Sequence, residues 1–216
     1  MKSFPIRSSI IILLIFVSTV SIAQETDSLV LLLTNKSELR IAGTSNINKF
    51  NCRLQQDFEQ DTLHIVTKSI NKELVFNHAK LRFFVSDFNC GHRPINKDFQ
   101  EAMQAENFPT ISLSVQKLHS TDSFKFENKY ADIRADIALE LAGISRSYQI
   151  GFERIEIESK KLSFVGQKEV RMSDFQIDPP KALMGIIKAN DDLVIHFNFE
   201  LLLIKRQNSQ SLGSKD

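Results

Sequence analysis

Apolar and polar residues alternate with a period of two along much of this 216-residue chain. In the clearest stretch, Leu193 to Leu203, aliphatic residues and phenylalanines take the odd positions, while His196, Asn198 and Glu200 take even ones. Successive side chains of a strand point to opposite faces, so this pattern predicts a long strand with one apolar and one polar face. A chain built from such strands is expected to bury the apolar faces in a sandwich or a barrel.

Further alternating stretches support an all-β fold. Ile133 to Leu141 and Ile111 to Val115 alternate regularly. Shorter or less regular versions lie at residues 38–45, 50–58, 63–70, 80–87, 147–157 and 162–172. Eight or more strands separated by turn residues favour a sandwich or a barrel over the other all-β arrangements.

One segment has a helical period instead. Asn96 is a suitable cap for a helix over residues 97–105, with Phe99, Ala102 and Met103 on its apolar side. Pro109 then ends it, because the residue before a proline is pushed out of the helical region. A single short helix among strands is expected to lie near one mouth of the barrel.

The first 23 residues predict an export signal. Lys2 and Arg7 give a positive start, residues 10–17 are all apolar, and Ser21-Ile22-Ala23 offers small residues at a cleavage site. The apolar run is shorter than the roughly 20 residues of a membrane-spanning helix; a buried N-terminal helix is the alternative. We therefore expect a signal peptide over 1–23, cleaved after Ala23, one domain over 24–206 and a disordered tail over 207–216. The protein would then be periplasmic or secreted, without stable insertion in a membrane.

Export makes the two cysteines informative. Cys52 and Cys90 are the only two in the chain, and each ends a Phe-Asn-Cys sequence. An oxidising compartment favours their pairing, so a Cys52–Cys90 disulfide is expected, with two buried free thiols as the alternative.

Signatures of catalysis and of nucleic-acid binding are weak. The chain has 27 Lys and Arg against 26 Asp and Glu, which argues against a nucleic-acid binder held by bulk charge. The five histidines show no metal-binding spacing, and the local motifs of nucleophilic and nucleotide chemistry are absent from the sequence. His92, with Asp98 as a partner, is the best catalytic candidate, and a solvated loop histidine is the alternative. We expect no catalysis, no cofactor and no metal.

The aromatic residues point toward an apolar interior or an apolar ligand. There are 17 Phe, 2 Tyr and no Trp, so nearly all the aromatic surface lacks a polar atom. The alternation places nine residues on the inward side: Leu81, Phe83, Val85, Leu113, Val115, Ile133, Ile137, Phe197 and Phe199. They either line a ligand cavity or pack a solid core.

A second distinctive stretch runs from Asp178 through two prolines to Gly185. It either forms a rigid connection to the last strand or rims the mouth of a barrel. In the second case Leu183 and Met184 would contact a ligand as it enters, since methionine adapts to irregular apolar shapes.

Three stretches in this order and spacing resemble the YceI-like family: residues 37–47, residues 96–102 leading into 108–111, and residues 141–146. The resemblance extends from about Glu38 to Leu203. It implies a periplasmic or secreted, lipocalin-like, eight-stranded antiparallel β-barrel whose interior holds a long isoprenoid or similar apolar chain. On this basis we expect a lipid carrier or store. An envelope protein-interaction module with a filled barrel and an enzyme with a site near His92 are the alternatives, and the sequence leaves the oligomeric state open, a homodimer included.

Overall fold

The structure is a computed structural model that describes residues 26–56, 58, 62–70, 73–77, 79–120, 133–152, 154–158 and 160–209. Its elements, in chain order, are β1 (Thr26–Leu33), β2 (Glu38–Ser45), β3 (Lys49–Leu54), β4 (Thr62–Ile70), β5 (Glu73–Asn77), β6 (Lys80–Phe84), η1 (Val85–Asp87), β7 (Phe88–Asn89), α1 (Arg93–Ala102), β8 (Thr110–Ser120), β9 (Ile133–Leu141), β10 (Ile144–Gly151), β11 (Arg154–Glu158), β12 (Lys161–Arg171), η2 (Met172–Phe175), β13 (Lys181–Ala182), η3 (Leu183–Gly185) and β14 (Ile187–Ser209). The predicted all-β class with one short helix is confirmed.

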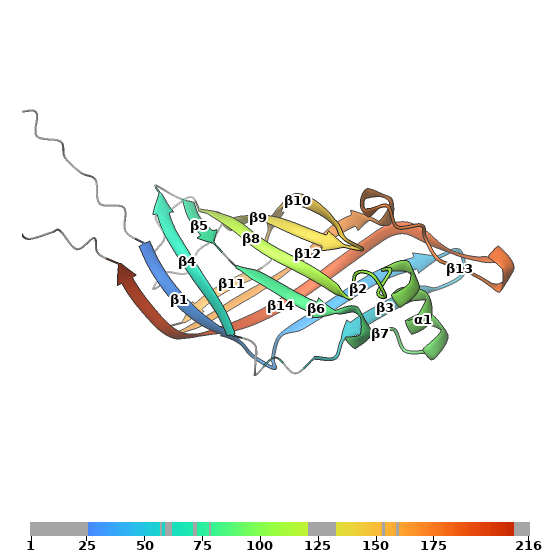
Figure 1. The fold of residues 1–216 in the computed structure, drawn as a ribbon, viewed down its shortest axis with the longest axis horizontal. Coiled ribbons are helices and arrows are strands. Elements are labelled where there is room, and N and C mark those ends of the chain that lie inside the picture. Colours follow the sequence, from blue (N-terminus) through green and yellow to red (C-terminus); the bar gives the residue numbers. More distant parts are fainter. Residues whose placement is uncertain are drawn as a thin grey trace, which may run out of the picture.

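The strands form one strongly twisted antiparallel sheet (Figure 1). Its main path runs in the order β10-β9-β8-β5-β4-β1-β14-β2-β3-β7, with β6 added to β8, β12 to β14, and β11 to β12. This path is open, with β10 and β7 at its two ends, and the described residues contain fourteen strands. The prediction of a closed barrel of eight strands is therefore wrong.

The strand number differs because long extended segments are divided or shared. β14 has 23 residues and pairs with β2 along its first half and with β1 along its second. The predicted strand over 147–157 is split between β10, which pairs with β9, and β11, which pairs with β12. Likewise β6 pairs with β8, and the chain then continues through η1 into β7, which pairs with β3. At both places one chain segment leaves the ladder of one strand and joins the ladder of another, so the ladder is interrupted there.

Strand β1 was not among the predicted strands. Every residue from Leu29 to Leu33 is apolar, so the sequence hides the alternation that the structure reveals. Leu29, Leu31 and Leu33 are buried, whereas the even-numbered residues between them are only partly buried. β1 pairs with β4 on one edge and with β14 on the other, and its even-numbered apolar residues lie on the outer, partly exposed face.

The helix exists where the sequence predicts it, but its bounds differ. α1 begins at Arg93, with His92 at the N-cap and Pro94 in the first turn, a position that suits the fixed φ of proline. Asn96 does not cap it; the Asn96 side chain instead accepts a hydrogen bond of 2.7 Å from the backbone N–H of Cys90. Phe99 and Met103 are buried, as predicted, and in Figure 1 the helix lies at the end of the molecule that also holds β2, β3 and β7.

Two further predictions concern the cysteines and the C-terminal segment. Cys52 in β3 is bonded to Cys90, which directly follows β7, the partner of β3. The disulfide prediction is thus confirmed. β14 continues to Ser209, three residues into the expected tail, because Gln207, Asn208 and Ser209 pair with the start of β1. Residues 1–23 and 210–216 lie outside the described residues.

Candidate ligand-binding site

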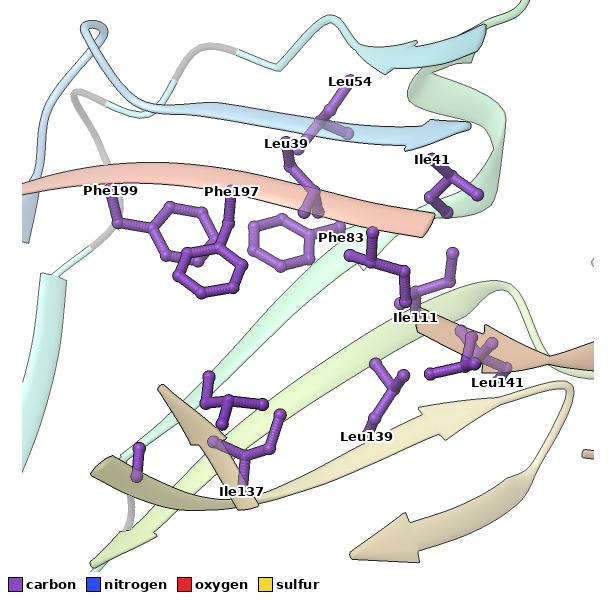
Figure 2. Close-up of a cluster of buried hydrophobic side chains, with 14 of the residues drawn as sticks. Leu39, Ile41, Leu54, Phe83, Ile111, Ile137, Leu139, Leu141, Phe197 and Phe199 are labelled. Atoms are coloured by element: carbon purple, nitrogen blue, oxygen red, sulfur yellow. The ribbon is translucent and has the colours of Figure 1, made fainter. Parts of the chain in front are cut away.

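The inward faces of the sheet enclose an apolar cavity of about 150 Å³. Its wall is built by alternate residues of β1, β2, β4, β5, β6, β8, β9, β10, β12 and β14. Figure 2 shows part of it, with Phe197 and Phe199 of β14 next to Phe83 of β6, and Ile137 and Leu139 of β9 on another side. Every lining residue except Lys168 is apolar. The interior is therefore not a completely filled core.

Eight of the nine predicted inward residues line this cavity: Leu81, Phe83, Leu113, Val115, Ile133, Ile137, Phe197 and Phe199. Val85 does not. It lies in η1, where the chain leaves the strand conformation, and it is 1% exposed, with its backbone N–H donated to the carbonyl of Pro109. Val85 belongs to the packed core instead.

Of the two residues predicted to contact an entering ligand at the rim, only the side chain of Met184 belongs to the described structure. Met184 is fully exposed and lines neither cavity described here, because its positive φ of 58° places it in a tight turn within η3. The side chain of Leu183 lies outside the described part of the structure. The Asp178–Gly185 segment leads through β13 and η3 into β14.

Sequence reasoning missed more than half of the wall. The missed residues on the early strands are Leu29, Leu31, Leu39, Ile41, Leu63 and Ile65, and those on the later strands include Phe152, Leu162 and Phe164. Most of these lie in stretches where alternation was recognised, so extending the same inward register would have found them. The lining residues of β1 and β5, and Ala79, lie outside every predicted stretch; in β1 the apolar run conceals the register.

Stacked phenylalanine rings form the most continuous part of the wall. The centroids of Phe83 and Phe199 are 6.1 Å apart and those of Phe197 and Phe199 are 5.7 Å apart, with nearly parallel planes. Phe152 meets Phe197 edge-on at 6.0 Å. A Cβ at Gly166 would lie 2.6 Å from the ring of Phe197, so only glycine leaves space for that ring beside β12.

The outer face of the sheet carries the charged pairs. Glu140 of β9 accepts hydrogen bonds of 3.0 Å from Lys80 and from Ser112, and the Lys80 ammonium is the main reason that the pKa of this carboxyl lies below its usual value. The imidazole of His119 lies between the carboxylates of Glu73 and Asp136, at 3.2 and 2.7 Å. These contacts place polar groups outward and leave the interior apolar, as the alternation predicts.

A second cavity, of about 540 Å³, lies between α1, β2, β3 and the start of β14. His92 and Asp98 both line it, together with the Cys52–Cys90 bridge and Phe99. Within the described residues no hydrogen bond joins the His92 and Asp98 side chains. The predicted pair therefore shares a cavity but does not form an acid–base unit. Ile41 lines both cavities, so the two are neighbours.

In the part of the chain that the structure describes, no helix is both long and apolar enough to cross a membrane. Over the same residues, no three His, Cys, Asp or Glu side chains gather where they could hold a metal ion.

Comparison with known proteins identifies relatives of this fold. A family model described as YceI-like domain matches residues 35–201. A polyisoprenoid binding domain from Saccharophagus degradans is 9% identical, with a TM-score of 0.55, and the match covers 81% of this chain and 99% of that one. A YCEI protein from Campylobacter jejuni is 17% identical with a TM-score of 0.42, over 65% of this chain and 74% of that one. No curated protein matches the sequence.

Proposed function

The chain belongs to the YceI-like domain family, and from this premise we propose that it binds a long apolar chain, an isoprenoid or a similar lipid, in its interior. The observation that carries the proposal is the cavity between the inward faces of the strands, whose wall is apolar at every lining position but one. Lys168 is the one polar side chain that this wall offers, so a small soluble metabolite would lose most of its hydrogen bonds to water on entering.

The physical chemistry of such a site favours a slender hydrocarbon chain. Each CH₂ group moved from water into an apolar environment contributes about 0.8 kcal/mol, so a long tail binds tightly without charged contacts. The flat rings of Phe197 and Phe199 present continuous apolar faces along one side of the cavity. The Saccharophagus degradans domain that shares this fold is described as polyisoprenoid binding, which supports the same ligand class.

The first cavity is small for a complete polyisoprenoid. At about 150 Å³ it takes part of a chain, and the neighbouring cavity of about 540 Å³ offers room for more. Ile41 is the side chain shared by the two walls. We propose that apolar side chains near Ile41 rearrange when a long chain binds and so enlarge the space available to it.

The same proposal assigns a carrier or storage role in the periplasm or outside the cell, with no chemistry performed on the ligand. The apolar, positively flanked segment over 1–23 supports export as a cleaved signal peptide, and the Cys52–Cys90 bond is typical of an oxidising compartment. A module with a completely filled interior is disfavoured by the cavity, and an enzyme near His92 lacks a bonded acid–base pair.

Titration with a fluorescent polyisoprenoid analogue tests the proposal. Leu113→Phe adds volume to the wall of the first cavity, so we expect weaker binding of the analogue by this variant with little loss of stability in the absence of ligand. Val66→Phe is the matched control, because Val66 is exposed on β4 and should leave binding unchanged. Absence of saturable binding by the unaltered protein would overturn the proposed function. A stability loss of about 1 to 3 kcal/mol for Leu113→Phe would show instead that the interior behaves as a solid core.

A further inference from the structure

One lysine of β12 faces the apolar interior. The inward row of this strand reads Leu162, Phe164, Gly166, Lys168 and Val170, and Lys168 is the only charged residue that the described structure places in the wall of the first cavity. Lys168 is partly buried. A charged group beside an apolar cavity costs free energy unless a partner compensates for the water it loses.

The described partner of the Lys168 ammonium is an aromatic ring. The ammonium nitrogen of Lys168 lies 4.9 Å from the centre of the Tyr148 ring, an attraction between a cation and an aromatic face. Over the residues that the structure describes, no carboxylate lies within 4.0 Å of this nitrogen. The hydroxyl of Tyr148 is itself buried without a hydrogen-bond partner among the described residues. Burial raises the pKa of Tyr148, so the hydroxyl keeps its proton and is available as a donor.

Lys168 and Tyr148 lie on two strands that no ladder joins. β10, which carries Tyr148, pairs with β9, whereas β12 pairs with β11 only from Lys161 to Val165. Beyond Val165 this edge of β12 faces β10 without backbone hydrogen bonds in the described structure. The two side chains therefore lie at a place where no backbone ladder joins the neighbouring strands.

The register places Lys168 at one end of the first cavity, whereas Tyr148 packs against Lys168 from outside the lining. Lys168 is opposite Ile195 of β14, and Ile195 is opposite Ile41 of β2, the residue that also lines the second cavity. Phe197 and Phe199 follow along β14 in the other direction. An extended ligand with its polar end at Lys168 would thus have its apolar part beside the stacked rings.

Charged groups of both signs act on Tyr148, and Asp174 acts on its pKa more strongly than either nearby arginine. Arg146 and Arg171 both lie close enough to Tyr148 to lower its pKa, and Asp174 is the one acid that acts on it in the opposite direction. Asp174 is also 3.8 Å from Arg171, so its charge is partly balanced already. Three cationic groups, Lys168, Arg146 and Arg171, thus stand against one carboxylate, and this balance of charge suits an anion.

From this geometry we infer that the protein prefers an amphiphile with an anionic head, a carboxylate or a phosphate, held between Lys168 and Tyr148 while the apolar tail lies along Phe197 and Phe199. The inference rests on the proposed function, since it names the head group of the ligand whose tail the cavity holds. A fatty acid and an isoprenyl phosphate both have this chemistry.

Matched pairs of ligands test the inference by competition with the fluorescent analogue. Hexadecanoic acid is compared with hexadecan-1-ol, and farnesyl phosphate with farnesol, so that only the head differs within each pair. Because hydrogen bonds to charged groups exceed those between neutral groups, the anion of at least one pair should bind about 10-fold to 100-fold more tightly than its alcohol. The pair with the larger ratio identifies which source of the anion the site favours.

Variants then assign the preference to the two side chains. Lys168→Met should bring the affinities for the acid and the alcohol within about threefold of each other, and Lys168→Gln provides a second version. Tyr148→Phe keeps the ring under Lys168 but removes the donor, so it should weaken anion binding several-fold. Lys181→Met is the control, because Lys181 is exposed on β13 and outside both cavities.

The outcomes separate the two proposals. Equal affinity for acid and alcohol in both pairs, or an anion preference that survives Lys168→Met, would overturn the anionic head while leaving lipid binding intact. Failure of all four ligands and of the fluorescent analogue to bind would overturn the proposed function and this inference with it.

Discussion

Removing the Cys52–Cys90 bond should destabilise the fold by an amount that its place in the chain allows us to estimate. The bond closes a loop with a sequence separation of 38 residues. In the chain-entropy model a loop of this length constrains the unfolded chain by about 4 kcal/mol at 25 °C. That is a large fraction of the roughly 5 to 15 kcal/mol by which native domains are stable.

The structure also indicates where the loss would be felt first. β7 has two residues and pairs with β3 only at Arg53–Asn89 and Leu54–Phe88. Without the bond, this short ladder and the burial of Phe99 would be left to hold the α1 end of the molecule against β3. We therefore expect amide exchange in α1 and β7 to accelerate more than exchange in β9 or the centre of β14.

Urea unfolding followed by far-ultraviolet circular dichroism measures the effect. Three samples are compared: the oxidised protein, the same protein kept reduced, and the Cys52→Ala, Cys90→Ala double variant. The reduced protein keeps both sulfur atoms in place, so its difference from the double variant isolates the packing of Cys52 and Cys90, which are 0% and 7% exposed. Two reactive thiols per chain in the unfolded, unreduced protein, or a loss below about 1 kcal/mol on reduction, would refute the reasoning.

Three other substitutions probe the interior and its polar surroundings. Ile137→Glu places a carboxylate in the apolar wall at a residue that is 4% exposed. The free energy of unfolding should fall by several kcal/mol and polyisoprenoid binding should be lost. A stable variant that still binds would contradict this. Gly166→Ala brings a Cβ to 2.6 Å from the ring of Phe197 and should cost about 1 to 3 kcal/mol in urea unfolding, with recovery in the Gly166→Ala, Phe197→Leu double variant. The hydrogen bond from Lys161 lowers the folded-state pKa of Glu200. The stability that it adds is therefore present above the unfolded pKa near 4.5 and is lost as the pH falls through the lowered value. Unfolding free energies measured from pH 7 to pH 3 should fall less steeply for Glu200→Gln, and identical slopes would exclude this contribution.

Local alternation was sufficient to predict most strands, and eight of the nine residues predicted to point inward line the first cavity. The stretches at 133–141 and 193–203 correspond to β9 and to the middle of β14, because a half-buried strand displays its two faces directly in the sequence. β1 was missed for the opposite reason, since its residues are apolar on both faces. The number of strands and the openness of the sheet depend on long-range pairing, such as the sharing of β14 between β1 and β2, which no local pattern reveals.

The candidate site was predictable in its apolar part and not in its polar part. Lys168 interrupts the inward register of the irregular 162–172 stretch, and a charged residue at an expected apolar position was the available signal. Its proximity to Tyr148 required the structure, because β10 and β12 meet in space without a ladder between them. The bounds of α1 differ from the predicted ones for local reasons. Pro94 favours a start before Asn96, and the Asn96 side chain accepts a hydrogen bond from the backbone N–H of Cys90 instead of capping the helix.

Native mass spectrometry of the protein, purified gently from its own host, tests most directly whether the interior binds a lipid. The account predicts a species heavier than the chain alone by the mass of one amphiphilic lipid, which is removed by organic solvent and restored by adding a polyisoprenoid or its phosphate. A chain mass without added ligand, unchanged after incubation with these lipids, would contradict it.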